Sequence, residues 1–184
     1  MIKGVLFAMA ITIGAASAAN AQVNTAPADK LVMETTKGKV VIALRPDLAP
    51  NHVKQITELT KDGFYNGIIF HRVIDGFMAQ TGDPTGTGMG GSDKPDLKAE
   101  FTDAPYVRGT VGMARSQNPN SANSQFFITF GDTSFLNGQY TVWGQVVEGM
   151  DVIDAINKGE PPRSPDKIVT MTVLEASAET EAAQ

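Results

Sequence analysis

The chain has 184 residues, of which 42% are hydrophobic, a length and composition that suit one domain with an ordinary packed core. It contains no cysteine, which excludes disulfides, thiolate catalysis, a lipidated cysteine and cysteine-ligated zinc. Twenty acidic residues face 15 basic ones, giving a formal net charge of −5, so the surface repels phosphate backbones and nucleic acid is not expected as a partner.

The first 21 residues have the pattern of a secretory signal peptide. Lys3 supplies the positive start, residues 4–16 are apolar and uncharged, and Ala19-Asn20-Ala21 fits the A-x-A cleavage pattern. The apolar run is shorter than the ~20 residues that span a bilayer, although an uncleaved anchor and cleavage after Ala18 remain alternatives. Cleavage after the tripeptide leaves 163 residues starting at Gln22, with 14 basic and 20 acidic residues and a net charge of −6. Such a simple signal is typical of bacteria, so we expect a periplasmic or secreted protein with no membrane attachment after cleavage.

Three further segments follow the signal peptide. Residues 22–29 are small and polar, and we expect them to form a flexible lead-in. Residues 30–175 are expected to form the folded domain, and the Ala- and Glu-rich residues 176–184 a disordered tail.

Within the domain, short runs of β-forming residues are separated by turn signals, the first turn being Lys37-Gly38. Helices are predicted at residues 50–61, where Pro50 suits the first helical position, and at residues 150–157. The predicted strands are residues 31–35, 39–44, 68–73, 77–81, 110–114, 126–130, 141–147 and 168–174. This pattern favours a β-sandwich or a closed barrel capped by the helices, and composition does not choose between the two.

The most informative stretch is residues 70–83, which we expect to form two short strands joined by a turn at Asp75-Gly76. Alternate residues of a strand share a face, so Arg72 and Gln80 are expected to lie beside apolar side chains. The predicted faces are Phe70, Arg72 and Ile74 against His71 and Val73, and Met78 and Gln80 against Phe77 and Ala79. A cation and an amide on a Phe/Met surface suit an apolar ligand with one amide to be polarised, such as a proline residue in a peptide.

Two other patterns are interpreted as structural. Residues 86–91 fit the dinucleotide fingerprint G-x-G-x-x-G, but Pro84 precedes them and Pro95 follows, where a strand and a helix N-terminus are required. We interpret them as a glycine-rich surface loop. His52 and His71 form no H-x-x-x-H or H-E-x-x-H pattern, and the sequence has no G-x-S-x-G elbow. Neither a metal site nor a Ser-His-Asp hydrolase is therefore expected.

Residues 70–83 meet every fixed position of the signature F-H-R-V-I-x-G-F-M-x-Q-x-G-D, and they thereby resemble the cyclophilin family of peptidyl-prolyl cis-trans isomerases. Two further blocks match the family in order and spacing. These blocks are residues 112–115 with 123–128, and residues 135–138 with 142–146. The resemblance implies a mainly β fold, namely a closed eight-stranded antiparallel barrel with one α-helix at each end.

The resemblance also implies a function. It predicts a bacterial exported isomerase that accelerates rotation about X-Pro peptide bonds, needs no cofactor or metal, and assists the folding of exported proteins. Proline-containing peptides and unfolded or exported proteins are the expected partners, and we expect a monomer.

Roles for individual residues follow from the same resemblance. Arg72, Gln80 and Phe77 are expected to be catalytic, with Arg72 aimed at the prolyl nitrogen and Gln80 holding a substrate carbonyl. Substrate contacts are expected from His71, Met78, Ala114, Arg115, Phe127, Phe135, Leu136 and Tyr140. Phe135 and Tyr140 stand where many members have tryptophan and histidine, and one extra residue lies between Ala114 and Ser124. Because phenylalanine lacks the indole donor, weak cyclosporin binding is expected.

Two other functions compete with this prediction. A cyclophilin-like barrel could hold proline-containing segments without useful turnover, or an unrelated barrel could be a hydrolase. The presence of Arg72, Phe77, Gln80 and Phe127 together disfavours a mere binding module, and the missing nucleophile signatures disfavour a hydrolase.

Overall fold

The computed structural model describes residues 30–174; the predicted signal peptide, lead-in and tail lie outside the described residues. All ten predicted helices and strands are present; three of them are one residue shorter than predicted, and two are three residues shorter. The strands are β1 (Lys30–Thr35), β2 (Gly38–Leu44), β3 (Arg72–Ile74), β4 (Met78–Thr81), β5 (Thr110–Met113), β6 (Phe126–Thr129), β7 (Val142–Glu148) and β8 (Ile168–Leu174). The helices are α1 (Pro50–Lys61) and α2 (Met150–Asp154), with a short 3₁₀ helix at Ser134–Leu136.

The two larger shortenings have identifiable causes. The predicted strand at residues 68–73 starts only at Arg72, because residues 67–70 bond to residues 166–168 instead of to β4. The predicted helix at residues 150–157 ends at Asp154, because the N–H of Asn157 donates to the Asp166 carboxylate at 2.8 Å rather than continuing the helix.

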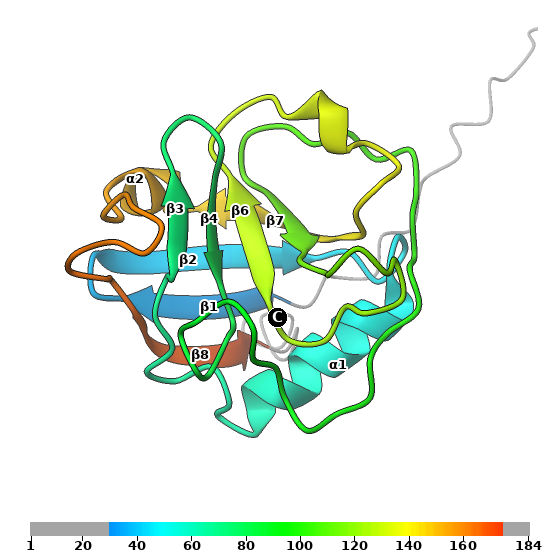
Figure 1. Ribbon diagram of the computed structural model, residues 1–184, viewed down its shortest axis with the longest axis horizontal. Coiled ribbons are helices and arrows are strands. Elements are labelled where there is room, and N and C mark those ends of the chain that lie inside the picture. The colour runs from blue at the N-terminus through cyan, green and yellow to red at the C-terminus, as the bar shows by residue number, and fades with distance from the viewer. Residues whose placement is uncertain (1–29, 175–184) are drawn as a thin grey trace, which may run out of the picture.

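The eight strands form one antiparallel sheet in the order β3-β4-β6-β5-β7-β2-β1-β8. The sheet curls into an open half-barrel, so the expected closed barrel is wrong (Figure 1). The edge strands β3 and β8 form no ladder with each other; an isolated bridge between Ile69 and Lys167 joins the segments that precede them. With only three residues, β3 is too short to close the sheet along its length.

The helices lie at different sides of the curled sheet (Figure 1). Helix α1 packs against β7 and β8, and α2 packs against β2. The first turn of α1 is capped by a residue that is distant in the sequence: Glu100 accepts the N–H groups of Asn51 and His52, both at 3.1 Å. No helix within residues 30–174 is long and apolar enough to span a membrane.

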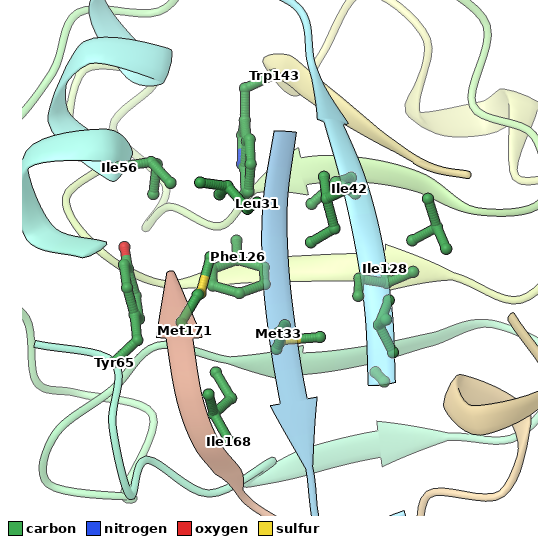
Figure 2. Packing of buried hydrophobic residues seen from close by; sticks show 14 of the residues in the cluster. Leu31, Met33, Ile42, Ile56, Tyr65, Phe126, Ile128, Trp143, Ile168 and Met171 are labelled. Carbon is green, nitrogen blue, oxygen red and sulfur yellow. The ribbon is translucent and has the colours of Figure 1, made fainter. Parts of the chain in front are cut away.

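The concave face of the sheet carries the main core (Figure 2). Trp143 and Tyr65 both pack edge-on against Phe126, with ring centroids 5.3 and 5.6 Å away. The Tyr65 hydroxyl donates to the Ser124 carbonyl at 3.0 Å, whereas the buried Trp143 Nε1–H has no hydrogen-bond partner among the described residues. Ile56 from α1 joins the cluster and so ties the helix to the sheet.

A second apolar cluster, which we call the outer cluster, contains Met78, Tyr106, Phe127, Leu136 and Val142. Strand alternation separates it from the main core, as the neighbours Phe126 and Phe127 show by belonging to different clusters. The same rule places Val73 in the core and Ile74 beside the outer cluster, as predicted. Phe70 was expected to share a face with Arg72, but it lies in the core because strand geometry begins only at Arg72.

Candidate active site

A cavity of about 310 Å³ opens above the outer cluster. Ten of the eleven predicted site residues line it, although they come from five separate parts of the chain. The lining residues are Arg72, Phe77, Met78, Gln80, Ala114, Arg115, Phe127, Phe135, Leu136 and Tyr140. We call this cavity the proline groove.

The sheet register places the central groove residues in one cross-strand row. Arg72 on β3 lies opposite Gln80 on β4, which lies opposite Phe127 on β6, which in turn lies opposite Gly112 on β5. A side chain at Gly112 would collide with the Tyr106 hydroxyl and lie 2.6 Å from the Phe127 ring. The missing side chain lets Phe127 stack on Tyr106, with centroids 5.8 Å apart and an interplanar angle of 18°.

The apolar walls of the groove differ in exposure. Phe127 is 5% exposed and Leu136 8%, so both are fixed parts of the floor. Phe135 is 63% exposed at the rim, where its ring lies 5.5 Å from that of Phe77. Both residues belong to the 3₁₀ helix, which places Phe135 at the rim and Leu136 in the floor. The result is a rigid apolar floor with a more accessible aromatic edge.

Arg72 is one of two arginines that line the groove. Its Nε–H donates to Glu160 Oε2 at 2.8 Å, and the Arg72 side chain is 41% exposed. Within residues 30–174 the two Nη groups of Arg72 make no hydrogen bond. They are therefore available as donors to a ligand in the groove, which Arg72 lines.

The amide of Gln80 is oriented by a second glutamine. Gln125 Nε2 donates to the carbonyls of Gly88 and Gly90 at 3.0 and 2.8 Å. Gln125 Oε1 must then face away from the glycine-rich loop, and it accepts Gln80 Nε2 at 2.9 Å. This arrangement fixes which end of the Gln80 amide points toward Gln125.

Arg115 and Tyr140 form one wall. The Arg115 guanidinium lies 4.5 Å from the Tyr140 ring centroid, a cation–π contact. Its Nη2 and Nη1 donate to the carbonyls of Gln139 and Ser116, both at 2.9 Å. The wall separates the proline groove from a neighbouring cavity of about 490 Å³, and Gln80, Ala114 and Arg115 line both cavities.

The glycine-rich loop lines the neighbouring cavity and is organised by Asp83. The Asp83 carboxylate accepts the N–H groups of Thr85, Thr87, Gly88 and Gly90 at 2.7, 3.1, 2.6 and 3.1 Å, and also the Thr85 hydroxyl at 2.8 Å. Burial alone would raise the pKa of Asp83, but these hydrogen bonds outweigh it and lower the pKa to about 2. The amides that a bound phosphate would need already serve Asp83, which supports the interpretation of a surface loop rather than a nucleotide site.

His71 is the one predicted site residue that does not line the groove. It is 6% exposed and lies under the glycine-rich loop, where a Cβ added to Gly88 would be 3.6 Å from its Nε2. Burial lowers its pKa against the opposing effect of Asp83, and the Arg72 charge lowers the pKa further. This placement does not support the substrate contact that was predicted for His71.

His52 lies on α1 and does not line the groove. Its Nδ1 lies 2.6 Å from Glu100 Oε2, and burial lowers the pKa of His52 despite this neighbour. Among residues 30–174, no group of three His, Asp or Glu residues could hold a metal ion.

Two residues that contact the predicted catalytic groups were missed by the sequence analysis. Glu160 is 88 residues from Arg72 in the chain, and no local pattern links the two. Gln125 stands within the second matching block, so its position carried a signal, but its bond to Gln80 depends on the β4–β6 pairing.

Comparison with known proteins decides the family. The family model described as "Cyclophilin type peptidyl-prolyl cis-trans isomerase/CLD" matches residues 30–173. The chain belongs to this family. A "Probable peptidyl-prolyl cis-trans isomerase" of Brucella suis is 53% identical to this cyclophilin over 181 residues, which cover 90% of this chain and 91% of the relative. A "Peptidyl-prolyl cis-trans isomerase-like 1" of Aspergillus fumigatus is 38% identical and covers 83% of this chain and 99% of its own length.

Solved cyclophilin structures have the same fold. The cyclophilin AquaCyp293 from Hirschia baltica has a TM-score of 0.76 and 32% identity, and the match covers 84% of this chain and 77% of that one. A cyclophilin-type isomerase of Cryptosporidium parvum, determined in the presence of the dipeptide Ala-Pro, has a TM-score of 0.74 and 31% identity. That match covers 79% of this chain and 99% of the Cryptosporidium chain.

Proposed function

We propose that this cyclophilin isomerises X-Pro bonds in the proline groove, with Arg72 as the transition-state donor and Phe77, Met78, Phe127 and Leu136 holding the proline ring. The observation that carries the proposal is the row in which Arg72, Gln80 and Phe127 lie on adjacent strands above a buried apolar floor. This row sets a cation and an amide beside an apolar cavity, which is the combination that a prolyl amide requires.

The chemistry follows from the electronic structure of the amide. Resonance gives the C–N bond a rotational barrier of ~18–20 kcal/mol, and uncatalysed X-Pro exchange takes tens to hundreds of seconds. In the twisted transition state the resonance is lost and the prolyl nitrogen carries a localised lone pair. A donor aimed at this nitrogen binds the transition state more tightly than either planar ground state, so it lowers the barrier. No covalent bond is broken, and the reaction requires no nucleophile.

Arg72 suits this role because its guanidinium stays charged and its Nη donors are free toward the groove. A ~10⁵-fold acceleration corresponds to ~7 kcal/mol of differential stabilisation, more than one charge-assisted hydrogen bond provides. The remainder is assigned to the fixed grip on both sides of the amide, with Gln80 holding a substrate carbonyl and the backbone of Arg115 pairing with the peptide.

The proposal is tested by Arg72→Ala in a protease-coupled assay with a proline peptide. Loss of one preorganised transition-state donor is expected to lower kcat/KM about 10²-fold or more. The thermal unfolding midpoint should change little, because the side chain lies outside both apolar clusters. An Arg72→Ala variant that keeps most of its activity would show that the transition-state role is wrong, and a wild-type protein without turnover would favour a binding module.

We further propose that the protein is exported, loses residues 1–21 and acts as a monomer on exported proteins in the periplasm. The support is the pattern of Lys3, the apolar residues 4–16 and Ala19-Asn20-Ala21. Intact mass of the protein recovered from the producing cell is expected to match a chain that starts at Gln22. A mass that includes residues 1–21 would contradict both cleavage and the periplasmic location.

A further inference from the structure

We propose that Glu160 is a positioning residue, which holds the Arg72 guanidinium so that its two Nη groups face the proline groove. This inference rests on the proposed catalytic role of Arg72. The contact that carries it is the hydrogen bond from Arg72 Nε to Glu160 Oε2, 2.8 Å long.

The position of Glu160 is set by the backbone rather than by its own side chain. The neighbouring Gly159 exchanges two hydrogen bonds with Val73: the Val73 N–H donates at 2.8 Å and the Gly159 N–H donates at 2.9 Å. Val73 directly follows Arg72 on β3, so this pairing delivers Glu160 to the arginine. Gly159 has φ +147°, and a side chain there would lie 2.6 Å from the Pro162 Cα. The local chain path at residue 159 therefore requires glycine.

The choice of Nε as the bonded atom matters for catalysis. An arginine side chain loses up to about 2 kcal/mol of rotamer entropy when it is ordered, so an unheld Arg72 at a half-exposed site samples orientations that miss the groove. A carboxylate on Nε orders the stem and leaves both terminal groups unoccupied. A carboxylate bonded to Nη would instead compete with the substrate for the same donors.

Three alternative roles make different predictions. A purely structural tie between the loop and β3 is already supplied by the Val73–Gly159 pair, so removal of the Glu160 side chain should not release the loop. A substrate contact by Glu160 would appear in KM. A general charge effect would be reproduced by any equivalent carboxylate, and Glu148 offers one, because it is exposed, pairs with Lys39 at 3.5 Å and does not line the groove.

The test measures kcat and KM by NMR exchange on a proline peptide for Glu160→Ala, Glu160→Gln and the control Glu148→Ala. Glu160→Ala is expected to lower kcat three- to fivefold with KM within about twofold. This equals about 0.7–1 kcal/mol at 1.4 kcal/mol per tenfold, the upper part of the range for exposed ion pairs. Glu160→Gln keeps an acceptor oxygen and should stay within about twofold of wild type. Glu148→Ala should match wild type, and all three variants should keep the wild-type unfolding temperature.

Pairing with Arg72→Ala provides the decisive control, because a residue that acts through Arg72 has nothing to position when the arginine is absent. Adding Glu160→Ala to Arg72→Ala should change the residual activity by less than about 1.5-fold, a non-additive result. An unchanged kcat in Glu160→Ala, a change confined to KM, equal losses in Glu160→Ala and Glu160→Gln, or full additivity with Arg72→Ala would each overturn the inference. If Arg72→Ala alone stays active, the proposed function fails instead, so the two failures are distinguishable.

Discussion

Replacing Asp83 with asparagine tests how the glycine-rich loop is held beside the groove. Asp83 is 1% exposed, and its carboxylate accepts four backbone N–H groups and one hydroxyl. Asparagine has nearly the same shape but offers one acceptor oxygen and an NH₂ group. Its better orientation keeps the oxygen toward Thr87, Gly88 and Gly90, and it then sets the NH₂ group against the N–H of Thr85.

The magnitude follows from these contacts. One backbone N–H loses its acceptor, at a cost of ~1–3 kcal/mol, and the loop is partly open to water, which favours the lower end of this range. The three retained bonds lose their charge assistance, which roughly doubles the strength of such a bond. We expect Asp83→Asn to lower the free energy of unfolding by about 2–3 kcal/mol. For a domain of this size, that corresponds to a fall in Tm of about 4–12 °C.

The measurement is thermal unfolding followed by circular dichroism between pH 7 and pH 2. Because folding lowers the pKa of Asp83 to about 2 from an ordinary value of about 3.9, its stabilisation is present above pH ~4 and is lost as the pH falls through about 2. The Tm difference between wild type and variant should therefore be constant from pH 7 to pH ~4 and narrow below that. Asp75→Asn is the matched control, since Asp75 is exposed and its side chain makes no hydrogen bond within the described residues. A fall in Tm under about 2 °C, or an equal fall in the control, would refute the reasoning.

Two further predictions concern the rim of the groove and the cap of α1. Phe135→Trp should tighten cyclosporin inhibition about ten- to a hundredfold, because an indole N–H satisfies an inhibitor carbonyl that phenylalanine leaves unpaired, while peptide turnover stays within about twofold. Titration of both proteins with the inhibitor measures this, and equal inhibition would contradict it. Glu100→Gln should lower Tm at pH 7, because hydrogen bonds from His52 and Asn51 outweigh burial and hold the pKa of Glu100 below its ordinary value. The stabilisation by the Glu100 carboxylate is present above pH ~4.3 and is lost below it. The Tm difference between wild type and Glu100→Gln should therefore shrink on acidification, and a difference that grows would contradict the prediction.

Ten of the predicted site residues line one cavity because strand alternation and the family blocks constrain the same residues. Arg72 and Gln80 fall on one face of a hairpin by the rule of alternation, and the sheet register then brings Phe127 beside them. Asp83 also belongs to the family signature at residues 70–83. Its role as the acceptor at the centre of the glycine-rich loop was not predicted, because it depends on the orientation of four backbone N–H groups and one hydroxyl.

The features that the sequence did not predict depend on contacts between distant segments. The sheet stays open because β3 is only three residues long and forms no ladder with β8, which no local propensity signals. Glu160 stands in a polar loop where a carboxylate is ordinary, and only the Val73–Gly159 pairing brings it to Arg72. The family resemblance assigned His71 to the substrate, yet its side chain is buried under the glycine-rich loop, because adjacent residues of an extended segment point to opposite sides.

The position of Arg72 on an edge strand explains how one groove combines a rigid floor with a guanidinium whose orientation is set by a neighbouring loop. Gln80 and Phe127 lie on inner strands with neighbours on both sides, so their backbone positions are fixed by two ladders. Arg72 has a ladder on one side only, and its other side is met by a loop that brings a carboxylate. A charged side chain with both its donors free could not be held by apolar packing without being buried, which would cost desolvation. An exposed carboxylate on Nε orders it without that cost, so changes at residue 160 should tune turnover while changes at Phe127 should alter binding of the proline ring.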